Sequence, residues 1–179
     1  DAEGDVWDLD WPVMQVDWFG AVAWSEWHAA RTGRPWRLPA ELEWEKAARG
    51  VDGRLYPWGD RFDASWCCNG DAHPGARMPA AVDRFPVDES PYGVRGMAGN
   101  VQEWCLDAFG RWPDGPRVVV PSIADPSPRT LRIARGGAWP IDGRYARTTA
   151  RGRLEALVRV TAVGFRAVCG APLGLEADR

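Results

Sequence analysis

The stretch that decides the fold runs Arg37-Leu38-Pro39-Ala40-Glu41-Leu42-Glu43-Trp44-Glu45-Lys46-Ala47-Ala48-Arg49-Gly50. It predicts a helix that begins just after Leu38-Pro39, because proline suits a first helical turn and the glutamates load the N-terminal half. Arg49 stands at the expected C-terminal end, and Gly50 is the expected stop.

A second helix is predicted upstream, from Asp17 to Arg31. Asp17 is a suitable N-cap, Gly33 follows the last turn, and the residues between them are rich in alanine and tryptophan. Apolar residues fall on most faces of this helix, so we expect it to be largely buried.

Downstream of Gly50 the chain breaks into short pieces rich in Gly, Pro, Asn and Asp, which predicts loops as far as Ala98. Five prolines interrupt residues 110–129, which predicts a surface excursion around a short strand at Val118–Val120. Strands are predicted in the final third at Leu131–Ala134, Tyr145–Ala150, Leu157–Thr161 and Gly164–Val168.

Length and composition exclude several classes of protein. The 179 residues are 45% hydrophobic and 26% charged, which predicts one domain over residues 1–179. The net charge of −3 and the absence of a basic run argue against nucleic acid, and no apolar stretch reaches the roughly 18 residues of a membrane span.

Four cysteines without CxxC spacing and two histidines, His28 and His73, supply a zinc site poorly. Buried thiols in a reducing compartment, with a cytoplasmic location favoured, are the simpler interpretation.

Six sequence blocks share one order along the chain. They are residues 12–18 (Pro-Val-Met-Gln-Val-Asp-Trp), 37–50, 56–60 (Tyr-Pro-Trp-Gly-Asp), 92–94 with 97–104 (Met-Ala-Gly-Asn-Val-Gln-Glu-Trp), 135–139 (Arg-Gly-Gly-Ala-Trp) and 164–166 (Gly-Phe-Arg). Together they resemble the formylglycine-generating-enzyme (sulfatase-modifying factor) family over about residues 12–168. The resemblance implies an irregular, loop-rich α+β fold of the C-type-lectin kind, with two main helices and short antiparallel strands. The N-terminal part of the family fold is short or missing here.

The family's copper chemistry needs two cysteines shortly after the Arg-Gly-Gly block, because soft thiolates hold Cu(I). The matching segment, Pro140–Arg151, contains no cysteine, so we expect no copper and no formylglycine generation. The resemblance then implies a non-catalytic ligand- or protein-recognition domain, one module of a bacterial multidomain signalling or effector protein. The alternative is an oxidase or oxygenase domain, which would either generate formylglycine with a copper pair assembled from remote cysteines or be the C-terminal part of an iron-dependent sulfoxide synthase whose histidines lie elsewhere.

A calcium position is also implied by the resemblance, with backbone carbonyls of Gly99 and Val101 and the carboxylate of Glu103 as ligands. The upstream ligand is missing, because the matching residue is Gly96, and Arg95 beside it adds positive charge. The alternative is a loop satisfied by its own hydrogen bonds or by water.

The span Pro140–Val163 matches a variable segment of related binding proteins, so it is the expected contact surface. The candidate ligand-binding residues are Arg144, Tyr145, Arg147 and Arg153. The alternative to ligand binding is a structural role, in which these arginines hold loops in place through ion pairs with carboxylates. Of the 12 tryptophans, those in or near the family blocks are expected to be scaffold. The four left as candidates for contact with a partner are Trp7, Trp11, Trp66 and Trp112.

Overall fold

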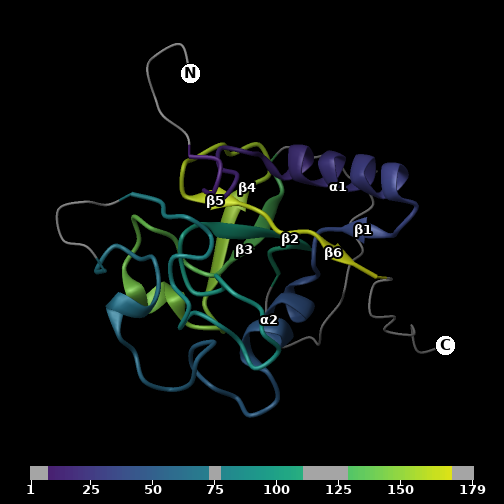
Figure 1. Cartoon of the computed structure of the whole chain (residues 1–179). Coiled ribbons are helices and arrows are strands. Elements are labelled where there is room, and N and C mark those ends of the chain that lie inside the picture. The colour runs from purple at the N-terminus through teal and green to yellow at the C-terminus, as the bar shows by residue number, and fades with distance from the viewer. Residues whose placement is uncertain (1–7, 73–77, 111–128, 171–179) are drawn as a thin grey trace.

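The computed structural model describes residues 8–72, 78–110 and 129–170 (Figure 1). The elements in chain order are α1 (Trp18–Thr32), β1 (Trp36–Arg37), α2 (Glu41–Arg49), η1 (Ala64–Trp66), β2 (Gln102–Ala108), β3 (Leu131–Arg135), η2 (Gly143–Ala146), β4 (Arg151–Glu155), β5 (Val163–Gly164) and β6 (Val168–Cys169). Long loops join these short elements, so the expected loop-rich α+β fold is confirmed.

Two sheets organise the described residues. The larger has the order β4-β3-β2-β5, in which the β2/β3 and β3/β4 pairs are antiparallel and the β2/β5 pair is parallel. The smaller pairs β1 with β6 antiparallel, placing Trp36 opposite Cys169. The strands are therefore mostly, but not all, antiparallel.

Both predicted helices are confirmed, together with their ends. The Asp17 carboxylate accepts the Gly20 N–H at 2.7 Å, and Gly33 closes α1 in the left-handed conformation at φ 66°. In α2 the Gly50 N–H donates to the Lys46 carbonyl. Ala40 is the N-cap of α2, and its N–H donates to the Glu43 carboxylate at 2.8 Å.

The expectation that α1 is largely buried is wrong. Only Trp18, Ala21, Val22 and Ser25 of this helix are buried. The rings of Trp24 and Trp27, in the next turns, are exposed. The helix lies at one side of the molecule, above β1 and β6 (Figure 1).

Among the predicted strands, β3 confirms the one at Leu131–Ala134, and β5 and β6 form near the two ends of Gly164–Val168. The strand predicted at Tyr145–Ala150 is wrong, because the Asp142 side chain accepts the Arg144 N–H and starts the 3-10 turn η2.

The strand predicted at Leu157–Thr161 is also wrong. The chain pairs with β3 earlier, through β4, and turns after Glu155, whose carbonyl accepts the Val158 N–H. Strand β2 was not predicted, and the strand predicted at Val118–Val120 lies outside the described residues.

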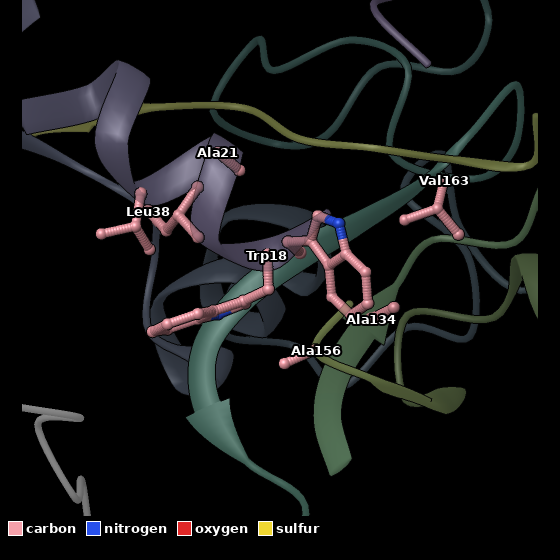
Figure 2. Packing of buried hydrophobic residues seen from close by; sticks show 8 residues of the cluster. Trp18, Ala21, Leu38, Ala134, Ala156 and Val163 are labelled. Atoms are coloured by element: carbon pink, nitrogen blue, oxygen red, sulfur yellow. The ribbon is translucent and has the colours of Figure 1, made fainter. Parts of the chain in front are cut away.

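Indole rings tie the core together. Trp18 and Trp104 are fully buried in one cluster, and Figure 2 shows Trp18 near Ala21, Leu38 and Ala156. The Trp18 N–H donates to the Cys105 carbonyl and the Trp104 N–H to the Val16 carbonyl, both at 2.9 Å. Each buried indole therefore satisfies its polar atom across the α1/β2 boundary.

Arginine side chains join α2 to the large sheet. The fully buried Arg135 of β3 pairs with Glu45, and Arg151 of β4 pairs with Glu41 at 2.6 Å. Glutamates in α2 thus receive cations from two adjacent strands, which orients the helix on the sheet.

We predict that Trp104→Phe lowers the free energy of unfolding by about 2 to 3 kcal/mol, because it leaves a small cavity and removes the hydrogen-bond donor to the Val16 carbonyl. The matched control is Trp58→Phe, whose indole N–H donates to the Arg61 carbonyl near the surface. It should cost less than about 1 kcal/mol. Urea unfolding measures both, and equal losses would contradict this account of the core.

Candidate functional site

Gly99, Val101 and Glu103 lie where the loop before β2 enters the sheet, and all three are buried. Both carboxylate oxygens of Glu103 are engaged. Arg166 donates to them through Nε at 2.5 Å and Nη2 at 2.6 Å, and the Trp44 indole N–H donates at 2.6 Å. The carboxylate thus links α2, β2 and the segment between β5 and β6.

The same guanidinium reaches the backbone of the preceding loop. Arg166 Nη2 lies 3.2 Å from the Arg95 carbonyl oxygen and 3.0 Å from that of Gly96. Gly96, with φ 68°, is the position where the resemblance would place a further calcium ligand. The Arg166 guanidinium therefore already binds carbonyl oxygens of this loop.

These residues fit a calcium ion poorly. Calcium takes six to eight oxygen ligands, whereas here the carboxylate accepts three N–H bonds and stands against a guanidinium. Within residues 8–72, 78–110 and 129–170, no group of three or more His, Cys, Asp or Glu side chains could hold a metal ion. Calcium at Gly99, Val101 and Glu103 stays a prediction, and the geometry favours a loop held by its own hydrogen bonds.

Glycine is required at position 99 because a Cβ there would clash with the Cys68 carbonyl. The next residue, Asn100, has φ 67°, and its side chain exchanges two hydrogen bonds with the backbone of Ala80. The loop is therefore fixed by close backbone approach and by amide pairing.

Asp88 lies beneath this loop with 2% of its surface exposed. Its carboxylate accepts the backbone N–H groups of Met97 and Ala98 at 3.3 and 3.0 Å. Burial raises the pKa of Asp88 to about 7, although these N–H bonds act in the opposite direction. Folding therefore favours the protonated carboxyl.

The thiols are placed poorly for metal chemistry. Cys67, Cys68 and Cys105 are buried, and burial raises the pKa of Cys67 to about 12 and that of Cys68 to about 11. Cys169 is exposed on β6. The segment that would carry the copper cysteines instead forms η2.

Three of the predicted ligand-binding residues lie together on or beside η2, and the fourth lies elsewhere. The Arg144 side chain is 69% exposed and pairs with Asp142, and Tyr145 is 43% exposed. The Arg147 Nε–H donates to the Arg144 carbonyl. Arg153 is on β4, with its guanidinium 5.0 Å from the ring centre of Phe109.

The structural alternative holds for two other arginines of this region. Arg151 pairs with Glu41, and Arg159 pairs with Asp17 at the start of α1. Both join the C-terminal third of the chain to a helix, so they are part of the scaffold.

Sequence reasoning missed a pocket of about 570 Å³ beside α1. Its lining includes Gly20, Trp24, His28 and Phe165. The sequence signal that could have revealed this pocket is a helix with more apolar faces than one packed side can cover.

A membrane-spanning helix, which must be both long and apolar, is not found in the described ranges.

A family model described as the sulfatase-modifying factor enzyme 1-like domain matches residues 5–171. A hercynine oxygenase of Mycolicibacterium smegmatis is 34% identical over 74% of this chain and 31% of its own. The serine/threonine-protein kinase pkn1 of Chlamydia pneumoniae is 34% identical over 72% of this chain and 19% of its own. The inactive C-alpha-formylglycine-generating enzyme 2 of Mus musculus is 35% identical over 73% of this chain and 38% of its own.

The fold matches a solved structure, PvdO from Pseudomonas aeruginosa, with a TM-score of 0.74 and 23% identity over 93% of this chain and 65% of PvdO. The chain spans about a third of the length of the hercynine oxygenases that it matches and about a fifth of the kinase.

We predict that Arg166→Met lowers the free energy of unfolding by about 3 kcal/mol, because it strands the buried Glu103 carboxylate without a cation. The matched control, Arg95→Met, breaks an ion pair with Glu89 whose side chains are 54% and 39% exposed. It should cost less than about 1 kcal/mol. Chemical denaturation measures both variants.

In a separate thermal denaturation experiment, the melting temperature of the unsubstituted chain should be the same in calcium as in a chelator. A melting temperature that rises steadily with calcium concentration would show that a metal binds the native state, and would contradict the role given to Arg166.

We predict that stability falls as the pH rises from about 4 to 7, because over this range Asp88 is protonated in the folded chain and ionised in the unfolded one. The stability that protonated Asp88 contributes is fully present below the pKa of this carboxyl in the unfolded chain. It is lost as the pH rises through its folded-state pKa of about 7. Asp88→Asn should flatten this slope. Asp52→Asn is the control, since Arg54 lowers the pKa of the exposed Asp52 to about 2. An unchanged slope in Asp88→Asn would refute the assignment.

Proposed function

Because the chain belongs to the sulfatase-modifying factor enzyme 1-like family, we propose that it is a non-catalytic recognition domain of a longer protein. One observation carries this proposal: residues 140–151, which would bring the copper cysteines, contain no sulfur and instead include the 3-10 turn η2 at Gly143–Ala146. Cu(I) needs soft thiolate ligands, and this segment offers only oxygen and nitrogen atoms.

The remaining cysteines support the same conclusion. A thiol must lose its proton to bind copper, and burial raises the pKa of Cys67, Cys68 and Cys105. Cys169 is exposed, but one thiolate is not a pair. Three of the four thiols are therefore core atoms.

The η2 segment supplies a surface suited to recognition. Arg144, Tyr145 and Arg147 are exposed, and they combine planar cations with an aromatic ring that carries a hydroxyl. Such side chains are favoured at protein interfaces. The turn is held from below, because the Gly143 N–H donates to Asp71 at 2.9 Å. A rigid turn that presents these groups favours an acidic partner.

Relatives support a modular setting. The kinase of Chlamydia pneumoniae is about five times as long as its matching part, so related sequences occur inside multidomain proteins. The inactive enzyme of Mus musculus is, by its name, a relative without the founding activity. We therefore place this domain within a bacterial signalling or effector protein.

The C-terminal part of an iron-dependent oxygenase is the second candidate, favoured by the identity to hercynine oxygenase. His28 stacks on Trp24, with ring centres 4.9 Å apart, and no group of three or more His, Cys, Asp or Glu side chains in the described residues could hold a metal ion. An iron site would therefore need ligands from outside the described residues. Stoichiometric Fe(II) binding by the full-length protein would select this candidate.

We predict that the chain retains no stoichiometric Cu(I) in competition with a chelating dye, because no exposed cysteine pair exists among the described residues. Residual copper on the exposed Cys169 should disappear in Cys169→Ser. Anaerobic thiol counting accompanies the titration. One Cu(I) per chain retained by Cys169→Ser would overturn the non-catalytic assignment.

A further inference from the structure

The pocket beside α1 is an aromatic groove, which we define by Trp24 and His28 of α1, Trp36 of β1, and Phe165. Gly20 and Ala167 also line it, and their small size leaves its volume of about 570 Å³ open. The neighbouring elements α1 and β1 and the distant segment after β5 therefore build one concave surface, which lies apart from η2. Pockets of this volume and composition are typical of binding sites.

The rings hold one another in place. Trp24 stacks on His28 with an interplanar angle of 14°, and Phe165 meets Trp24 edge-on at 5.4 Å between ring centres. His28 in turn lies 5.1 Å from Trp36. Such mutual packing fixes the shape of the groove before an occupant arrives, which lowers the entropy cost of binding.

Apolar surface continues beyond the groove. Trp24 is 43% exposed, Trp27 on the same helix is 53% exposed, and Val13 at the groove is 60% exposed. Clustered exposed rings of this kind mark interaction surfaces, and tryptophan is the residue that most often dominates binding energy. A small molecule confined to the groove would leave Trp27 exposed, so this extent favours a polypeptide.

The polar groups define the chemistry of the occupant. Among the described residues, the buried Trp36 Nε1–H has no hydrogen-bond partner, so it needs an acceptor. Arg34 lies over Trp36 at 5.7 Å and Arg31 over Trp27 at 4.8 Å. Neither arginine forms an ion pair within the described ranges. Cations on aromatic rings with no acidic partner complement a negatively charged occupant.

We propose that the aromatic groove binds an acidic polypeptide segment, which inserts one large apolar side chain into the groove against its ring lining. Carboxylates that flank this anchor contact Arg31 and Arg34. The inference rests on the proposed recognition function and assigns it a second surface, since the residues predicted from sequence lie on η2. It also adds Trp24 and Trp27 to the tryptophans expected to contact a partner; of the four expected from sequence, Trp7 and Trp112 lie outside the described residues.

The test pans a display library of random short peptides against the whole chain and measures synthetic copies of the enriched peptides by fluorescence anisotropy. We expect peptides with one large apolar residue among Asp and Glu. Trp24→Ala and Val13→Glu should each weaken them about tenfold or more. Val13→Glu keeps the rings and adds a repelling charge at the groove, so it remains informative if Trp24→Ala is unstable. Melting temperatures verify the folding of every variant.

Val51→Glu is the matched control, because Val51 is 85% exposed and does not line the groove, and it should bind the peptides normally. If the double variant Tyr145→Ala with Arg147→Ser loses binding while Trp24→Ala and Val13→Glu keep it, the peptides bind η2, so recognition stands and the groove assignment fails. If no peptide is enriched, both the groove assignment and peptide recognition fail. If no peptide binds but phenylpropionate saturably shifts the Trp36 indole resonance, the groove takes small molecules and the polypeptide assignment is overturned.

Discussion

The contact on which the rest of the structure depends is the buried pair of Glu103 and Arg166, completed by the indole N–H of Trp44. One carboxylate receives donors from α2 and from the segment after β5, while the guanidinium also gathers two loop carbonyls. A chain with so little regular structure needs such cross-links, because its loops cannot satisfy their backbone groups within helices or sheets. The cation that holds the loop at residues 95–96 is therefore the guanidinium of Arg166, a group of the chain itself.

Local signals predicted the helices well, and pairing between distant segments explains the errors in the strands. Asp17, Gly33 and Gly50 act within one turn of their helix, so their effect is visible in sequence. Strand β4 reads Arg-Gly-Arg-Leu-Glu, which has no apolar alternation, and it forms because β3 pairs with it along residues 131–135. The strand predicted at Tyr145–Ala150 does not form, because a single capping aspartate, Asp142, starts a 3-10 turn there.

The site was predictable in its members and not in their partners. Glu103 was singled out, but Arg166 lies 63 residues away, and no periodic pattern links the two. Burial of α1 was overestimated because periodicity shows which faces are apolar without showing which are covered. That error concealed the aromatic groove, whose rings come from α1, β1 and the segment after β5.

Taken together, the interior is a self-sufficient scaffold and the outer surfaces carry the function. Buried acids are engaged by arginines or backbone amides, and three of the four thiols are core atoms. The most direct test of this account is elemental analysis of the full-length protein, purified from its native host without added metal. The account predicts copper and iron well below one atom per chain. One tightly held copper or iron atom per chain would contradict a non-catalytic recognition domain.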